Sequence, residues 1–283
     1  MTTATIIADS VFHSGNRLTT FYLRYPRIIH AEVLTHRAFS RNSSSSRAIP
    51  ISKMLAEVKQ NGFTPSVWIA AHAGMAGSKL AKDTYNLNRL WEKAKTHALG
   101  CATIMHEAGG SKQVINRLIE PFSYIDVILT AEHNQKGLGN FFELRAPKYP
   151  EGWEHKSHTP SENFLNSSST AQWEIQELAQ AMQNAISLST PIAKDDNMGV
   201  HVPFNNNQEF YSEAAIAIAV VKCARVSFGN ALKEIDALEA LGKYEALKAN
   251  KHASPFEHIC RPSAVPCPGN FEDWQQLRHI IGL

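Results

Sequence analysis

The sequence has few of the features that mark secreted, membrane or nucleic-acid-binding proteins. It contains only four cysteines, and none of them forms a CxxC pair or a zinc-type spacing: Cys101, Cys223, Cys260 and Cys267. No stretch approaches the ~18 apolar residues that a membrane span needs, and the N-terminal MTTATIIADSVFHSG lacks the basic start and long apolar run of a signal peptide. The formal net charge is only +2, so no global excess of positive charge attracts a nucleic-acid polymer. We therefore expect a cytoplasmic protein with reduced, mostly buried cysteines.

The usual phosphate-binding loops are also missing, because the chain carries neither a GxGxxG nor a P-loop sequence. Strands and helices are predicted to mix without a βαβ rhythm, so we expect an α+β fold with a mixed or antiparallel sheet flanked by helices. Apolar spacing predicts strands at 18–25 and 122–130, and helices at 27–35, 85–107, 211–223, 233–249 and 271–281. Polar composition predicts loops at 40–47, 146–170 and 190–210.

A further helix is predicted after residue 170. Ser169 or Thr170 is expected to cap it, and Trp173 is expected in the core. Its apolar stripe is formed by Ile175, Leu178, Met182 and Ile186.

The most informative segment is THRAFSRNSSSSR, from Thr35 to Arg47. It places three arginines, one histidine and several hydroxyl groups within thirteen residues. A guanidinium presents a planar fork that matches phosphate oxygens, and serine hydroxyls with backbone N–H groups add further donors. On composition alone, a solvated basic loop is an equally good interpretation.

The spacing of this segment resembles the signature RHRxxSxNxxSxR of the flavin-dependent thymidylate synthases, the ThyX family. Thr35 replaces the first arginine, and the other six fixed positions match at His36, Arg37, Ser40, Asn42, Ser45 and Arg47. The segment NQKGLGNFFELR is similar to a second family motif, with lysine where arginine is usual, through Asn134, Lys136, Asn140, Phe141 and Arg145. Arg117 followed by Pro121 resembles the family's Arg-xxx-Pro, and AQWEI at 171–175 resembles the helix after the catalytic arginine.

A third group of motifs is out of order. The segments ARVSF at 224–228 and HASPFEH at 252–258 resemble the region that opens the family's fold, but here they follow the other motifs. We expect a circular permutation, which a fold tolerates when its ends lie close together at the surface. The resemblance then implies one ThyX-like domain over 1–283. Its parts are a signature and nucleotide-binding part (1–145 and 171–190), a loop insertion (146–170) and a permuted FAD-binding part (211–283).

The resemblance implies an FAD-dependent methyltransferase of nucleotide biosynthesis that converts dUMP to dTMP, with methylenetetrahydrofolate and NADPH as co-substrates. Each site would combine residues from neighbouring subunits of a homotetramer. Arg145 would be catalytic, because it would lie against the pyrimidine edge and favour ionisation of the ring at N3. The nucleotide-binding positions would be Glu32, Ser43 (where the family usually has glutamate), Ser45, Arg47, Arg117, Arg145 and Gln275. The FAD-binding positions would be Thr35, His36, Arg37, Asn134, Lys136, Asn140, His252, Ser254 and Arg278.

Three features leave alternatives open. Glu32 stands where the family has glutamine, and a carboxylate can accept a hydrogen bond from the amino group of cytosine, so dCMP as substrate or a hydroxymethyl product is an alternative. Thr35 weakens the signature. One alternative is that Arg278, together with Gln275 or Gln276, compensates for this change. The other is that the protein is a non-catalytic flavin- or nucleotide-binding relative. His155 and His158 lie three residues apart without an acidic or thiol partner in a defined pattern, so we expect no metal.

Overall fold

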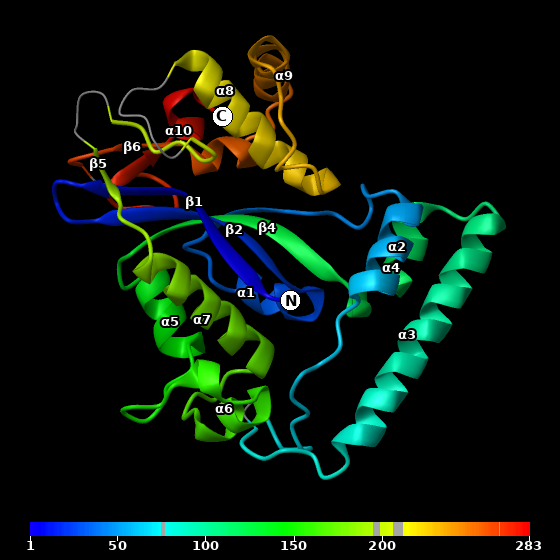
Figure 1. Cartoon of the computed structure of the whole chain (residues 1–283). Helices are drawn as coiled ribbons and strands as arrows, with labels where there is room; N and C mark the ends of the chain where they lie inside the picture. The colour runs from blue at the N-terminus through cyan, green and yellow to red at the C-terminus, as the bar shows by residue number, and fades with distance from the viewer. Residues whose placement is uncertain (75–76, 195–198, 206–211, 266) are drawn as a thin grey trace.

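The computed structural model describes residues 1–74, 77–194, 199–205, 212–265 and 267–283, and it contains a five-stranded mixed sheet with helices on both sides (Figure 1). The strand order is β3-β4-β2-β1-β5. β5 pairs in parallel with β1, and the other neighbours pair antiparallel. The strands are β1 (Thr3–Phe12), β2 (Arg17–Pro26), β3 (Ser40–Ser43), β4 (Tyr124–Glu132) and β5 (Ile192–Lys194). The predicted α+β class with a mixed sheet is confirmed.

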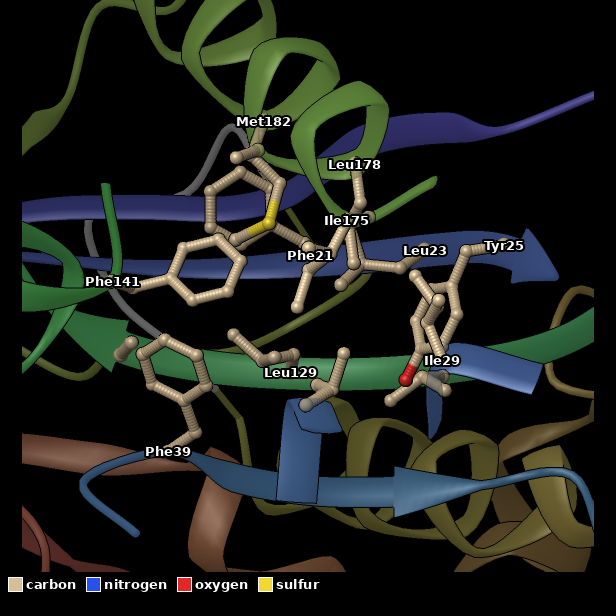
Figure 2. Close-up of a cluster of buried hydrophobic side chains, with 14 of the residues drawn as sticks. Phe21, Leu23, Tyr25, Ile29, Phe39, Leu129, Phe141, Ile175, Leu178 and Met182 are labelled. Carbon is tan, nitrogen blue, oxygen red and sulfur yellow. The ribbon is translucent and has the colours of Figure 1, made fainter. Parts of the chain in front are cut away.

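Alternation along β2 and β4 gives the sheet two different faces. On one face Phe21, Leu23 and Tyr25 are completely buried. They pack with β4 side chains under α5 (Leu138–Arg145) and α7 (Trp173–Ser187), as Figure 2 shows. The predicted α7 stripe contributes to this core through Ile175, Leu178 and Met182, and Trp173 is also buried, which confirms both predictions.

The opposite face is covered by the C-terminal part of the chain (Figure 1). Ile7 and Ile128 of the sheet contact Cys223 and Val226, which belong to α8 (Glu213–Arg225) and η4 (Val226–Phe228). The same layer continues through α9 (Ala237–Ala249), η5 (Ser254–His258), the hairpin β6 (Cys260–Pro262) and β7 (Trp274–Gln276), and α10 (Leu277–Ile280). The ARVSF and HASPFEH segments therefore lie in the layer on one face of the sheet.

A helical arm extends beside the sheet (Figure 1). It consists of α2 (Ile51–Asn61), α3 (Thr84–Glu107) and α4 (Lys112–Leu118), which pack through Met54, Val58, Ala102 and Ile115. Ala102 is the one buried residue of α3. The helix at 85–107 is confirmed, but its predicted apolar stripe is largely exposed. None of the described helices is long and apolar enough to cross a membrane.

The remaining elements correct several predictions. Residues 27–35 form η1 (Arg27–Ile29) and α1 (His30–Leu34), as expected. Part of the predicted loop 40–47 is β3, because β4 offers it an antiparallel edge from Thr130 to Val127. The 146–170 segment is not a plain loop, since it contains η3 (His155–Ser157) and α6 (Pro160–Asn166).

Other boundaries were also wrong. Gln172, and not Ser169 or Thr170, precedes α7, and it makes no side-chain cap. The predicted helix 271–281 divides into β7 and α10, because β7 pairs with β6. β5 lies in the predicted loop 190–210. Residues 195–198 and 206–210 of that loop are outside the described residues. The first residue of the predicted helix 211–223 is also outside them. The short helix η2 (Glu120–Phe122) precedes β4.

Candidate functional site

The signature segment 35–47 adopts a different structure in each of its parts. Residues 35 and 36 follow α1, residues 40–43 form β3, and residues 44–47 lead into α2. Arg41 holds the first turn together, because its guanidinium donates to the carbonyl oxygens of Leu34, His36 and Phe39 at 3.2, 3.0 and 2.9 Å. No family motif pointed to Arg41; its place among three arginines was the available signal.

Three predicted residues from α1, the following turn and α5 meet at one point. Arg145 donates from Nε to Nε2 of His36 at 3.3 Å, and its NH1 lies 3.9 Å from Oε2 of Glu32. The His36 ring stacks on Phe39 and packs edge-on against Phe141, with ring centroids 5.6 and 4.9 Å apart. The Arg145 guanidinium is thus oriented from one side, while its side chain remains 26% exposed.

The protonation state of His36 matters for this arrangement. Burial, with the charges of Arg145 and Arg41, lowers the pKa of His36 to about 4. At neutral pH the imidazole is therefore uncharged, and its Nε2 accepts the hydrogen bond from Arg145 without charge repulsion. A positively charged guanidinium is held here by a neutral ring and a nearby carboxylate, with capacity left for an anionic ligand.

A cleft of about 610 Å³ lies on the other side of the same turn. Three arginines line it, Arg37, Arg41 and Arg278, together with one carboxylate, Glu257. Arg278 donates from NH1 to Oε1 of Glu257 at 2.6 Å. Because positive groups outnumber the acid, we name this the arginine cleft; it suits an anion such as a phosphate group.

The arginine cleft forms because the C-terminal segment packs on the signature segment. Asn270 donates from Nδ2 to the Phe39 carbonyl oxygen at 3.3 Å and to Oγ of Ser40 at 3.0 Å. Gln276 donates from Nε2 to Oγ of Ser40 at 2.7 Å. Two predicted residues, Arg37 and Arg278, are thereby brought together. Gln276, and not Gln275, contacts the signature; Gln275 instead pairs in register with Arg261.

Asn134 and Lys136 follow β4 and contact the C-terminal segment at another place. Asn134 donates from Nδ2 to Oε2 of Glu132 at 2.8 Å and to Oε2 of Glu272 at 3.2 Å, and Lys136 forms an ion pair with Glu272. Glu132 in turn accepts from the backbone N–H groups of Glu272 and Asp273. Asn140 lies on α5, one turn before Arg145. These contacts hold the 132–136 turn against the segment that supplies Arg278.

The predicted phosphate-binding residues form a separate group at the arm. Asn116 donates from Nδ2 to the Ser46 carbonyl oxygen at 2.7 Å, which joins α4 to the signature loop beside the exposed Arg47 and Arg117. Ser45 donates its backbone N–H to the Ser227 carbonyl oxygen at 3.0 Å, so the ARVSF motif contacts this loop. Ser43 is half-buried at the end of β3.

His252 belongs to a third location. It lines a second cleft of about 610 Å³ between α8 and α9, together with Arg225 and Phe228. Ser254 is exposed at the start of η5, and the Thr35 hydroxyl donates to the Glu32 carbonyl oxygen at 2.6 Å. Arg145, the two arginines Arg47 and Arg117, and His252 thus lie at three locations. Within the described part of one chain, no hydrogen bond or ion pair connects these locations.

The described histidines and cysteines have other surroundings than a metal site. Among the described residues, no group of three or more His, Cys, Asp or Glu side chains could hold a metal ion. His155 and His158 instead stack on Tyr149 and Trp153, with ring centroids 6.1 and 4.0 Å apart. Cys223 and Cys260 are buried, Cys267 is half-buried and Cys101 is exposed, and all four are free thiols.

Solved structures that are similar to this chain include two of a UMP/dUMP methylase. No family model and no curated protein sequence matches the chain. A UMP/dUMP methylase, PolB from Streptomyces cacaoi bound with 5-Br dUMP, is similar over 60% of this chain and 66% of that chain, just under two thirds, at 16% identity and a TM-score of 0.42. PolB bound with 5-Br UMP is similar over 60% and 69%, at 16% identity and a TM-score of 0.43. Similarity at this level assigns neither a fold family nor an activity.

Proposed function

We propose that this protein uses FAD to transfer a one-carbon unit from methylenetetrahydrofolate to C5 of a pyrimidine deoxynucleotide monophosphate, converting dUMP to dTMP. The observation that supports it most is the arginine cleft. Two residues far apart in the sequence meet there: Arg37 of the signature, and Arg278, which we expect to compensate for the missing first arginine of the signature. The permuted chain order, the single ThyX-like domain and the cytoplasmic location remain predictions within this proposal.

The chemistry of the arginine cleft fits the diphosphate of FAD. Its guanidinium groups match phosphate oxygens, and Nε of Arg41 is buried without a hydrogen-bond partner among the described residues. Arg37, Arg41 and Arg278 would hold the diphosphate. When bound, the flavin would supply the hydride, with NADPH as the source of electrons.

Arg145 would stabilise negative charge on the pyrimidine ring. Carbon 5 of uracil is a poor nucleophile, so charge must first accumulate on the ring, and a fixed guanidinium lowers the free energy of that state. The neutral His36 ring and Glu32 orient the guanidinium before the nucleotide binds. One such preorganised donor contributes about 3 kcal/mol to transition-state stabilisation.

In the proposed enzyme, residues from a second subunit would help to bind the nucleotide phosphate, as the family resemblance implies. Among the described residues, Arg47 and Arg117 share no hydrogen bond or ion pair with Arg145, and in the proposed assembly they would contribute to the site of a neighbouring subunit. Exposed apolar side chains on α3 and α4 offer a surface for subunit contacts: Tyr85, Leu90, Ile104, Met105, Val114 and Leu118. We therefore propose a homotetramer in which neighbouring subunits complete each site.

A second candidate substrate is dCMP. The Glu32 carboxylate lies 3.9 Å from Arg145, where it can accept a hydrogen bond from the exocyclic amino group of cytosine. A hydroxymethyl product is the matching alternative for the transferred group.

The deciding experiment uses purified protein, NADPH, labelled methylenetetrahydrofolate and either dUMP or dCMP. We expect a flavin absorbance spectrum that bleaches with NADPH, and a product with the mass of dTMP. Arg145→Lys should lower kcat by roughly 100-fold while flavin affinity changes little, because the lost interaction forms mainly in the transition state. Colourless protein that binds no added FAD would instead support a non-catalytic relative, and equal loss of flavin binding and kcat would refute the role of Arg145.

A further inference from the structure

A smaller cleft lies between α7 and the 147–163 segment, outside the residues used above. Its volume is about 250 Å³. Tyr149, His155 and His158 line one side, and Glu177 and Gln180 of α7 line the other. This volume is below the usual range of pockets for drug-sized ligands, so it suits a single bicyclic ring and excludes a dinucleotide.

The aromatic side of this cleft is already ordered. The Tyr149 and His155 rings are nearly parallel, at 3°, and His158 stacks on Trp153 at 15°. Asn163 fixes the turn behind them, because its Nδ2 donates to the His155 carbonyl oxygen at 2.8 Å and its Oδ1 accepts from Nε1 of Trp153 at 2.9 Å. Flat rings held in parallel planes favour a planar aromatic ligand.

The α7 side supplies the carboxylate of Glu177, and its cationic neighbour is the Met1 amino group, which also lines the cleft. No described lysine or arginine forms a salt bridge with Glu177. Burial and the nearby Glu174 raise the pKa of Glu177 to about 7. A hydrogen bond from Trp173 and the charge of the Met1 amino group act in the opposite direction and lower this pKa. An acid with a raised pKa in a cleft is typical of a binding site. The neighbouring Gln176 is already satisfied, since it bonds to Ala171 and Ser167.

We propose that this cleft binds a planar heterocycle with a cyclic guanidine edge, the ring N–H beside an exocyclic amino group that pterins and guanine share. The two parallel N–H donors of that edge match the two oxygens of the Glu177 carboxylate, in the geometry that arginine uses with carboxylates. The ring lies against Tyr149 and His155, and the Gln180 amide contacts its polar rim. This site is separate from the arginine cleft and does not depend on flavin binding.

Calorimetric titration of the whole chain with two ligand pairs tests the proposal. The pairs are 6-hydroxymethylpterin against 6-hydroxymethyllumazine, and guanosine against xanthosine; in each pair the second compound carries an oxygen in place of the exocyclic amino group. We expect the amino compound of at least one pair to bind at least tenfold more tightly than its oxo analogue, because a site that hydrogen-bonds a donor discriminates strongly against its loss. Binding within the first pair only identifies a pterin, and within the second pair only a guanine.

Variants separate recognition from folding. Glu177→Gln should weaken binding of the amino compound at least tenfold, whereas Glu143→Gln, on the exposed side of α5, should leave it unchanged. Tyr149→Ala should also weaken it, and circular dichroism checks that each variant is folded. The proposal is overturned if no amino compound binds, if the oxo analogues bind equally well, or if folded Glu177→Gln retains wild-type affinity.

Discussion

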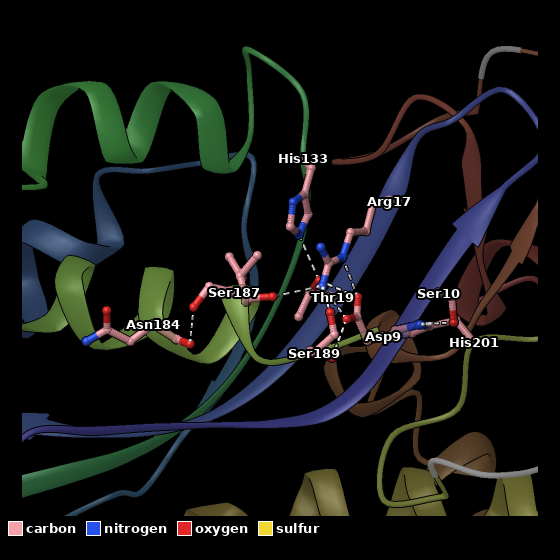
Figure 3. Close-up of polar contacts among 10 residues, drawn as sticks. Asp9, Ser10, Arg17, Thr19, His133, Asn184, Ser187, Ser189 and His201 are labelled. Carbon is pink, nitrogen blue, oxygen red and sulfur yellow. Dashed lines mark hydrogen bonds and ion pairs between the residues drawn. The ribbon is translucent and has the colours of Figure 1, made fainter. Parts of the chain in front are cut away.

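His201 and His258 are fully buried side chains that join the C-terminal layer to the sheet. His201 bonds through Nδ1 to Oγ of Ser10 at 2.9 Å, as Figure 3 shows, and through Nε2 to Oγ1 of Thr20 at 2.7 Å. Thr20 bonds to Thr130 at 2.7 Å, and Thr130 bonds to Nδ1 of His258 at 2.8 Å. This chain of hydrogen bonds crosses β1, β2 and β4, and burial keeps both imidazoles neutral.

The buried histidines should make the fold sensitive to acid. Burial lowers the pKa of each to about 3, whereas an unfolded chain protonates histidine near pH 6.5. Below pH 6.5 the unfolded state therefore binds more protons, and the stability that is present above pH 6.5 is lost as the pH falls toward 3. The free energy of unfolding should fall by about 1.4 kcal/mol per pH unit for each histidine in the acidic range. Denaturant titrations at several pH values measure that slope.

A variant assigns the slope to these residues. His258→Gln should lower stability at pH 7.5 but should make the slope between pH 6 and 4.5 shallower by about one proton. The control His106→Gln, exposed near the end of α3, should leave the slope unchanged. An unaltered slope in His258→Gln would show that other groups cause the acid sensitivity.

A second polar network stabilises the start of the β1–β2 hairpin (Figure 3). Thr19 donates to Oδ1 of Asp9 at 2.9 Å and bonds to Nε2 of His133 at 2.8 Å. Burial by itself raises the pKa of Asp9, but hydrogen bonds from Arg17 and Ser189 outweigh this effect and lower the pKa. The ionised carboxylate thereby links the hairpin to the segment after α7.

At the scale of elements, the β6–β7 hairpin and α10 act as one unit that closes the arginine cleft. Hydrogen bonds from Gln276 and Asn270 to Ser40 position the unit, and its helix α10 carries Arg278. The signature segment has Thr35 at the position of the expected arginine. The guanidinium that this unit supplies to the cleft therefore cannot be predicted from the signature segment alone.

Arg278→Ala should therefore weaken FAD binding by at least tenfold, because it removes a guanidinium from the proposed diphosphate site. Flavin fluorescence titration measures the dissociation constant. Arg261→Ala is the matched control, since Arg261 is exposed on the neighbouring strand β6 and does not line the cleft; its affinity should equal that of the wild type. Unchanged FAD affinity in Arg278→Ala would remove this residue from the site.

At the scale of the whole molecule, the arm suggests how copies of the chain associate. α3 has 24 residues and buries one, while Tyr85 is 80% and Ile104 is 67% exposed. We propose that packing against another copy of the chain stabilises this long, largely exposed helix.

We expect the wild type to sediment as a tetramer. The double variant Leu90→Glu with Ile104→Glu should sediment as a smaller species with unchanged circular dichroism, because two carboxylates oppose burial of the α3 surface. Leu188→Glu, at a site 89% exposed beyond α7, is the control and should remain tetrameric. Wild-type protein that is monomeric at micromolar concentration would contradict the shared-site proposal.

Local patterns predicted the elements whose apolar residues recur with the period of a strand or a helix. The alternation of Phe21, Leu23 and Tyr25 predicted β2, and helical spacing predicted α3 and the stripe of α7. Motif spacing also selected Glu32, His36 and Arg145, which the structure brings together. These predictions succeeded because period and spacing are properties of the chain itself.

Long-range pairing decided the rest. A serine-rich segment is a strand only because β4 is beside it, and Gln276 rather than Gln275 reaches Ser40 only because β6 and β7 pair in that register. By itself, the sequence determined the fold class, the main amphipathic elements and the arginine-rich signature. Only the tertiary structure decided which charges share a cleft, because those contacts join residues more than 200 positions apart and no local pattern encodes them.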